Sequence, residues 1–178
     1  MQQHSAHQQY YTASTIKTIF CGLFLEYCSD LFYNIVPVLP KYQLAGGFLN
    51  EVGPDNQVSY EILLYLMIVI SDNTATMIIY EALTKKLGDL ATFLQKKFSL
   101  TETTIFDARI NYDYALSTPN EFGKLLNYFL ITSPQKEVLK KILSLQYVKG
   151  RGLRYIDDTS ILLSGNKTGQ LDDMINDS

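Results

Sequence analysis

The sequence predicts an α/β fold of the α+β kind, in which helices dominate and strands contribute little. Apolar residues recur at helical spacing along most of the 178 residues, and residues that begin or end helices lie between these stretches. Two segments near the C-terminal end, 159–163 and the one carrying Lys167, are rich in β-branched and aliphatic residues and predict strands. The length fits one domain, and 47% hydrophobic residues suffice for a core.

The first predicted helix begins near Thr12–Ser14 and runs toward Tyr33. The segment 36–40 ends it because it contains two prolines, which cannot continue a helix. A loop rich in Gly, Pro, Asn and Asp follows at 46–56. The apolar face of this first helix consists of Ile16, Ile19, Phe20, Leu23, Phe24 and Tyr27.

Later helices are predicted from their boundary residues. A helix at 59–70 is apolar on all sides and should be central. Asp72 caps a helix at 74–86, which Gly88 ends. The remaining helices are predicted from Asp89 to Phe98, from Pro119 to Ile131 after the capping box Thr118–Glu121, and from Ser133 to Gln146.

Composition and charge exclude several classes of function. The net charge is −3, the isoelectric point is near 5.3 and Lys and Arg never exceed two in a row, which argues against a nucleic-acid partner. The 13 Tyr and 9 Phe are therefore assigned to the core and to cleft walls. The longest apolar run, Ile62–Ile70, has nine residues, whereas a membrane span needs about 20. We expect a monomer without a cofactor.

The cysteines and histidines predict neither a disulfide nor a metal site. Cys21 and Cys28 lie seven residues apart on the first predicted helix, so their Cα atoms would be about 10 Å apart, too far for a disulfide. They are expected to pack as small apolar residues. A zinc site would also need His4 and His7, which lie in the polar segment 1–13, expected to be frayed.

Three short motifs stand in a fixed order along the chain. They are S-x-x-K at Ser14 and Lys17, S-D-N at Ser71–Asn73, and K-T-G at Lys167–Gly169. A lone S-x-x-K arises by chance about once in a chain of this length, and the second one here, Ser133–Lys136, is interpreted as a helix start. All three motifs in order should arise in well under about one in a hundred such chains, so the trio carries the signal.

The trio resembles the motifs of class A β-lactamases and penicillin-binding proteins. Tyr11–Lys17 before an apolar stretch resembles the nucleophile helix, and Glu61–Thr76 resembles the helix and turn that present the second motif. Leu116–Pro119 resembles the exit of the Ω loop. The resemblance covers roughly residues 10–178 and is closest to serine hydrolases of class A type with a short Ω loop.

This resemblance implies a β-lactamase/transpeptidase-like fold, with helices beside a five-stranded antiparallel sheet. Residues 14–178 would form a partial domain, mainly the helical subdomain with part of that sheet. We expect the chain to be truncated at both ends, so that the strand carrying Lys167 lacks neighbours for its hydrogen bonds. Members of the family are usually exported, but segment 1–13 has no signal-peptide pattern, so the localisation stays open.

The resemblance implies that Ser14 is the nucleophile of an acyl transfer. A serine hydroxyl needs a neighbouring base, and Lys17 lies one helical turn further on the same face. A lysine acts as a base only when burial or a nearby cation lowers its pKa, and Lys167 could supply that charge. By resemblance, Ser71 relays a proton between Lys17 and the leaving nitrogen, since a hydroxyl both donates and accepts.

The remaining motif residues are assigned to substrate binding. By resemblance, Asn73 holds the substrate's side-chain amide and also contacts the base, while Asp72 is structural, as a helix cap. Lys167 and Thr168 would bind the substrate carboxylate. Gly169 would leave the strand edge open, and the backbone amides of Ser14 and Gln170 would form the oxyanion hole.

One feature departs from class A β-lactamases, whose Ω loop carries a glutamate for deacylation. Between Thr101 and Thr118 the pattern R-x-E-x-x-L-N is absent, and Asp107 and Asp113 are the carboxylates that could replace it. The predicted function is therefore opening of β-lactam amides through an acyl-Ser14 intermediate, with a small-molecule β-lactam or D-alanyl peptide-like substrate. The alternatives are a penicillin-binding, D-alanyl transpeptidase-like protein with slow deacylation, or a non-catalytic remnant of such an enzyme.

Overall fold

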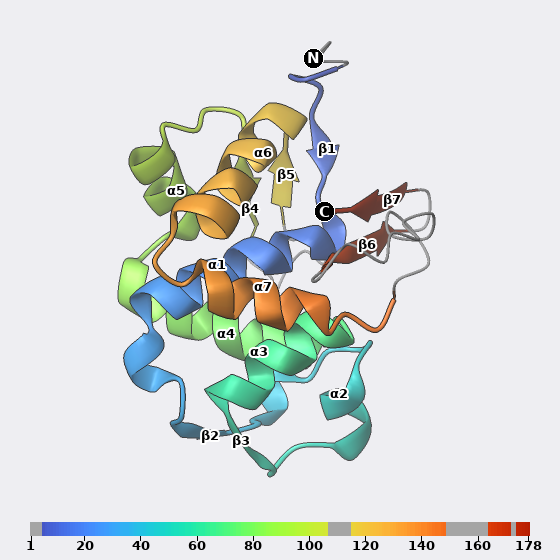
Figure 1. Ribbon diagram of the computed structural model, residues 1–178. Helices are drawn as coiled ribbons and strands as arrows, with labels where there is room; N and C mark the ends of the chain where they lie inside the picture. Colours follow the sequence, from blue (N-terminus) through green and yellow to red (C-terminus); the bar gives the residue numbers. More distant parts are fainter. Residues whose placement is uncertain (1–4, 107–114, 149–163, 172–173) are drawn as a thin grey trace.

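The computed structural model describes residues 5–106, 115–148, 164–171 and 174–178. Its central element is helix α1, Lys17–Tyr27 (Figure 1). Its residues from Lys17 to Leu25 are all buried because α3, α4, α6 and α7 pack around it. Gly22 is required at one of these contacts, since a Cβ there would lie 2.5 Å from the Phe129 ring. The prediction that this helix reaches Tyr33 is wrong: it ends at Tyr27, and a 3-10 turn at Ser29–Leu31 follows.

The helices around α1 begin where capping side chains predict. The side chains of Ser59, Asp72, Asp89 and Thr118 each accept a hydrogen bond from a backbone amide three residues later. These helices are α3, Tyr60–Val69; α4, Asn73–Leu87; α5, Leu90–Phe98; and α6, Pro119–Asn127. Helix α7, Lys136–Ser144, has no side-chain cap and begins three residues after Ser133, its predicted start. The predicted helix 119–131 is in fact α6 followed by a π-helical turn, Tyr128–Thr132.

The segments between the first two predicted helices contain structure that their composition does not indicate. Strand β2, Ile35–Pro37, pairs antiparallel with β3, Gln57–Ser59. A 3-10 turn at Pro40–Tyr42 and the short helix α2, Phe48–Val52, lie between them. The loop predicted at 46–56 therefore includes one helical turn. Pro37 is the last residue of β2, which a proline can be because β2 is an edge strand of a two-stranded sheet.

A second sheet forms from three very short strands. Strand β5, Ala115–Ser117, pairs with β1, Tyr10–Tyr11, on one side and with β4, Thr104–Ile105, on the other. The end of segment 1–13, expected to be frayed, is therefore held by strand pairing directly before the first motif. Two-residue strands are too short to show a period of two in the sequence, so pairing with β5 could not be anticipated.

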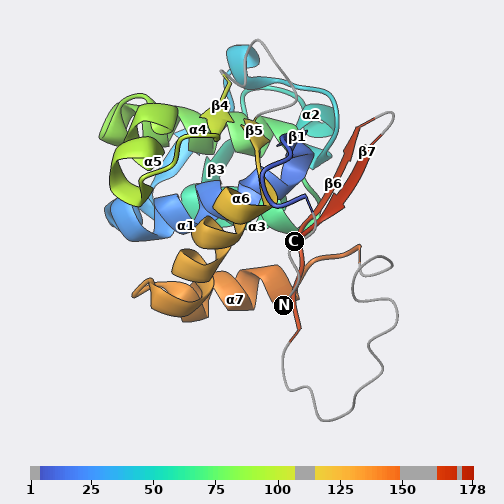
Figure 2. The ribbon, with the colours of Figure 1, turned by 90° about the horizontal axis from the view of Figure 1, so that it is seen from above.

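The third motif lies at the start of an antiparallel hairpin. Strand β6, Thr168–Leu171, pairs with β7, Met174–Asp177, so the expectation that the strand near Lys167 lacks a neighbour is wrong. Figures 1 and 2 place this hairpin beside the end of α1 that begins at Lys17, and β6 packs on the turn before it. The strand predicted at 159–163 lies outside the described residues.

Glu121 ties the start of α6 to the segment that enters β4. Thr118 Oγ1 accepts a hydrogen bond from the Glu121 amide, which is one half of the predicted capping box. The Glu121 carboxylate instead accepts bonds from the amides of Thr101 and Glu102, at 2.6 and 3.1 Å, and from Thr103 Oγ1 at 2.6 Å. The second half of the box is therefore replaced by a contact between distant segments.

Replacing Glu121 with Gln should destabilise the protein by about 2 kcal/mol at pH 7, because an amide NH2 would then face backbone N–H donors. Burial raises the pKa of Glu121, but the bonds from Thr103, Thr101 and Glu102 outweigh it and hold the pKa below the usual 4.5. The stabilisation is therefore present above pH 4.5 and is lost as the pH falls through the lowered pKa. Urea unfolding at several pH values measures both effects.

The matched control for this test is Glu137→Gln, at an exposed carboxylate paired with Lys140 one turn away. It should change the free energy of unfolding by less than about 0.5 kcal/mol. Equal stabilities of the two variants at pH 7 would contradict the role assigned to Glu121.

Candidate active site

The three motifs converge on the hydroxyl of Ser71. Ser71 Oγ accepts a hydrogen bond from Lys17 Nζ at 3.1 Å and another from Lys167 Nζ, also at 3.1 Å. Lys17 belongs to the first motif, Ser71 to the second and Lys167 to the third. Residues far apart in sequence thus form one hydrogen-bonded group, as the resemblance to the family motifs implied.

Ser14 lies in a 3-10 turn, η1, Ala13–Ile16, that runs directly into α1. The turn is anchored by Thr12, whose amide and hydroxyl both donate to the carbonyl of Ala115 in β5, at 2.8 and 3.2 Å. The Lys17 amide donates to the carbonyl oxygen of Ser14, so the two side chains are one turn apart. Ala13 has a φ of +46°, a left-handed conformation that L-residues other than Gly, Asn and Asp rarely adopt.

Lys17 is fully buried at the start of α1, and acceptors surround its ammonium group. Its Nζ donates to Asn73 Oδ1 at 2.7 Å, to the Ser71 carbonyl at 2.8 Å and to Ser71 Oγ. Burial lowers the pKa of Lys17 well below 10.5, the nearby charge of Lys167 lowers it further, and Asp72 acts in the opposite direction. Lys17 therefore meets the physical conditions for a lysine base.

Ser71 sits in a strained turn between α3 and α4. Its φ of +61° is in the left-handed region, which costs a non-glycine residue about 1–2 kcal/mol. This conformation places the Ser71 hydroxyl against Lys17 and Lys167 while its carbonyl also accepts from Lys17. Such strain in a packed site is typical of functional positions.

Asp72 has two structural contacts, of which the sequence predicted one. Its Oδ1 accepts from the Ala75 amide at 2.8 Å, which is the predicted cap of α4. Its Oδ2 accepts from the Leu49 amide, also at 2.8 Å, and so holds α2 beside the site. Gly47, with a φ of +126°, makes this approach possible, because a Cβ there would lie 2.5 Å from the Asp72 carboxyl carbon.

Asn73 is fixed by the loop 45–47, which precedes α2. Its Nδ2 donates to the Ala45 carbonyl at 2.7 Å, and its backbone amide donates to the Gly46 carbonyl at 2.9 Å. The side-chain oxygen therefore faces Lys17, because the Ala45 carbonyl can only accept and so must face the Asn73 NH2 group. The loop 45–47 thereby sets the orientation of Asn73, a contribution that no sequence motif indicated.

Lys167 is the second buried cation of the site. Its Nζ donates to the Thr168 carbonyl at 2.6 Å as well as to Ser71 Oγ. Burial lowers the pKa of Lys167 to about 8, against an opposing effect of Asp177. Lys167 and Ser178 exchange backbone hydrogen bonds in both directions, at 2.8 and 3.1 Å, which fixes the register of the hairpin.

Gly169 allows β6 to lie directly on the turn of Ser14. A Cβ at Gly169 would be 3.0 Å from the Ser14 nitrogen, 3.0 Å from the Thr12 carbonyl oxygen and 3.1 Å from the Ala13 Cβ. The absence of a side chain at Gly169 thus serves close backbone packing, in addition to the predicted open edge.

The register of the hairpin gives the direction of the Gln170 amide. Lys167 and Ser178 form a hydrogen-bonded pair, and such pairs alternate with non-hydrogen-bonded ones along an antiparallel ladder. Gln170 pairs with Ile175 in the non-hydrogen-bonded position, so its N–H points away from β7, to the edge that faces η1. The amides of Ser14 and Gln170 thus belong to two facing segments.

The sequence matches the family described as "Beta-lactamase enzyme family" over residues 2–178. The chain belongs to this family. The family and the enzyme class predicted from the three motifs are therefore confirmed. No curated protein matches the chain.

Solved structures of β-lactamases share the fold. The β-lactamase of Sphaerobacter thermophilus is 20% identical with a TM-score of 0.77, and the match covers 98% of this chain and 70% of that one. A class A β-lactamase of Bacteroides cellulosilyticus is 17% identical, with a TM-score of 0.79 and the same coverages. PBP-A is 22% identical, with a TM-score of 0.78, and the match covers 93% of this chain and 64% of PBP-A. The β-lactamase/transpeptidase-like fold is confirmed, and the chain spans about two thirds of the length of PBP-A.

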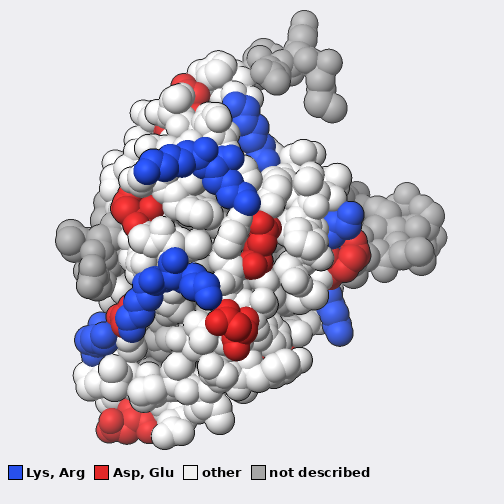
Figure 3. Space-filling model, turned by 90° about the vertical axis from the view of Figure 1, so that its left-hand side faces the viewer, with Lys and Arg blue, Asp and Glu red and all other residues white. Residues whose placement is uncertain are grey.

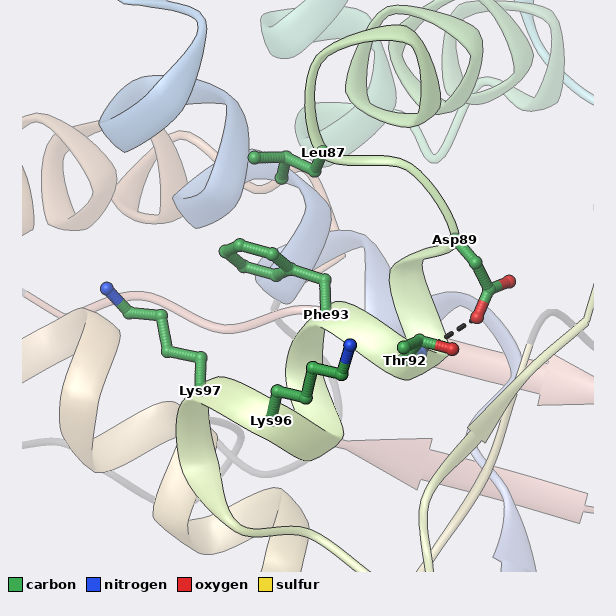
Figure 4. A pocket seen from close by; sticks show the side chains of 6 residues that line it. All are labelled: Leu87, Asp89, Thr92, Phe93, Lys96 and Lys97. Atoms are coloured by element: carbon green, nitrogen blue, oxygen red, sulfur yellow. Dashed lines mark hydrogen bonds between the residues drawn. The ribbon is translucent and has the colours of Figure 1, made fainter.

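Surfaces remote from the motifs offer no comparable arrangement among the described residues. On the face in Figure 3, basic and acidic side chains lie among one another. The ion pairs of the described residues include Lys85–Glu81 and Lys86–Asp30. A hollow of about 380 Å³ beside α5 contains none of the motif residues (Figure 4). Its lining consists of Leu87, Asp89, Thr92, Phe93, Lys96 and Lys97.

The part of the chain that the structure describes bears on several other expectations. It contains no cluster of three or more His, Cys, Asp or Glu side chains able to hold a metal ion, and none of its helices is long and apolar enough to cross a membrane. Cys21 and Cys28 are buried free thiols. Asp107 and Asp113, the candidates for a deacylating carboxylate, lie outside the described residues.

Gly169→Ala should destabilise the protein by about 1–3 kcal/mol, because the new methyl group must push β6 away from the turn of Ser14. The matched control is Gly123→Ala in α6, where a Cβ would meet no atom within 4 Å and alanine favours the helix by up to about 1 kcal/mol. Urea unfolding of both variants measures the difference. Unchanged stability of the Gly169 variant would show that β6 does not lie in close contact with the turn.

Proposed function

We propose that this chain opens β-lactam amides by transferring their acyl group to Ser14. The observation that carries the proposal is the position of Ser71 Oγ between two buried lysines, Lys17 and Lys167. Lys17 follows Ser14 by one turn, and its backbone amide donates to the Ser14 carbonyl oxygen. The family to which the chain belongs supports the same chemistry.

In the proposed acylation, the Ser14 hydroxyl attacks the lactam carbonyl and neutral Lys17 takes its proton. Burial and the nearby charge of Lys167 lower the pKa of Lys17 well below 10.5, which favours the neutral form that a base requires. As the carbon–nitrogen bond breaks, Ser71 passes a proton from Lys17 to the leaving nitrogen through the 3.1 Å hydrogen bond. The product is an acyl-Ser14 ester with a protonated ring nitrogen.

Substrate binding is proposed to involve the second and third motifs. Lys167 and Thr168 would bind the substrate carboxylate, and Asn73 its side-chain amide. The backbone amides of Ser14 and Gln170 would stabilise the oxyanion, which is typically worth about 3–4 kcal/mol per donor in the transition state.

Slow deacylation is the second candidate function. It rests on the absence of the class A glutamate pattern between Thr101 and Thr118. A single-residue mutant of PBP-A, 21% identical to this chain, has been solved as an acyl-enzyme complex with penicillin G. Without a base that activates water, an acyl-Ser14 ester in this chain would persist as well.

The first test is intact-mass spectrometry over time after mixing the chain with penicillin G. We expect an adduct of the ligand's mass in the unchanged protein and none in Ser14→Ala. Ser133→Ala is the matched control, because Ser133 belongs to the second S-x-x-K, and it should label like the unchanged protein. Decay of the adduct would support hydrolysis, and a stable adduct would support slow deacylation. If a folded chain formed no adduct, this result would contradict the proposal.

The rate of acylation should depend on pH through both lysines. It should rise as Lys17 loses its proton, and fall as the pH passes about 8 and Lys167 loses the charge that binds the carboxylate. The second-order acylation constant, measured as a function of pH, should therefore decline above about pH 8 as Lys167 loses its charge.

Lys167→Arg provides the control for this profile, since a guanidinium stays charged throughout the range. The alkaline decline should disappear in this variant, whatever its absolute rate. An unchanged alkaline limb would show that Lys167 is not the group that titrates there.

A further inference from the structure

Asn176 connects the β6–β7 hairpin to the strand that precedes the nucleophile. Its Nδ2 donates to the Tyr11 carbonyl oxygen at 2.8 Å, across 165 positions of sequence. In the ladder of the hairpin, Asn176 pairs with Gly169. Because Gly169 has no side chain, the β6 backbone lies close enough to the turn for Asn176 to reach β1.

The nucleophile turn is therefore held from two directions. On one side, Thr12 donates twice to Ala115 in β5, and Tyr11 pairs with Leu116. On the other side, the hairpin meets the turn through Gly169 and through Asn176, and Figures 1 and 2 show it projecting from the helical body there.

We propose that Asn176 is a positioning residue, which fixes the distance between the turn of Ser14 and strand β6 through its bond to the Tyr11 carbonyl. This inference rests on the proposed function, in which the amides of Ser14 and Gln170 bind one oxygen atom together. The two amides come from separate segments, so their spacing depends on contacts between β6, β7 and η1.

The chemistry requires this spacing to be well defined. Donors of an oxyanion hole act only when both lie at hydrogen-bond distance from the developing negative charge. A displacement of about 1 Å at a reacting centre can reduce a rate by about a hundredfold. The Asn166–Asp177 bond, at 2.8 Å, joins residues of the hairpin to each other and cannot replace the bond to Tyr11.

The test compares Asn176→Asp with Ile175→Ala. Asp keeps the size of Asn but presents an oxygen to the Tyr11 carbonyl, so the bond is lost. Ile175 is the neighbouring residue of β7, is 64% exposed and serves as the matched control. Circular dichroism and thermal unfolding of both variants show whether they remain folded.

The first readout is amide hydrogen exchange, which does not depend on activity. Segment 10–17 contains the hydrogen-bonded amides of Thr12 and Thr15, and segment 164–171 contains that of Lys167. We expect exchange in both segments to become at least about fivefold faster in the Asn176 variant and to stay unchanged in the Ile175 variant. Equal exchange in the two variants would overturn the proposal.

The second readout is acylation by penicillin G. In the Asn176 variant the maximal acylation rate should fall about tenfold or more, while the half-saturating concentration changes by less than about twofold. Equal maximal rates in the Asn176 and Ile175 variants would also overturn the proposal. If the unchanged protein forms no adduct, the proposed function fails, and the exchange measurement still decides whether Asn176 holds the hairpin on the turn.

Discussion

Two lysine ammonium groups share one serine hydroxyl inside this protein, and the rest of the site is arranged around that constraint. Lys17 and Lys167 are fully buried, so each loses hydration, and the charge of Lys167 further disfavours a charge on Lys17. The carbonyls of Ser71 and Thr168 and the side-chain oxygen of Asn73 replace the lost water as acceptors. The same environment that makes the lysines costly to bury lowers their pKa values, which the proposed chemistry requires of Lys17, the base.

This arrangement is maintained by backbone conformations that are unfavourable by themselves. Ala13 and Ser71 both adopt positive φ values, one directly before Ser14 and the other at the shared hydroxyl. Tertiary contacts hold each of them: Thr12 is bonded to β5, and Asp72 is bonded both to α4 and to the start of α2. Strain of this kind persists only where the surrounding packing determines the conformation more strongly than the local backbone does.

The site therefore lies where a rigid helical body meets a small hairpin. Helix α1 is buried along most of its length and carries Lys17, whereas β6 reaches the turn of Ser14 through Gly169 and through the bond from Asn176. The hydrogen bonds of Glu121 to Thr101 and Thr103 lie in the helical body. They fix the segment that enters β4, and β4 pairs with β5. Glu121 thus acts within the helical body, whereas Gly169 and Asn176 act where the hairpin meets the turn of Ser14.

The sequence alone determined where most of the long helices begin and to which family the chain belongs. Caps such as Asp72 and Asp89 act within three residues, so helix starts were predictable, and the three motifs indicated the family. Only the tertiary structure decided what depends on distant partners: β1 with β5, the second role of Asp72, the left-handed Ser71, and the contact of Asn176 with Tyr11. The physical reason is the separation in sequence between the bonded residues. A hydrogen bond between near neighbours leaves a pattern in the sequence, whereas a contact across 165 positions leaves none.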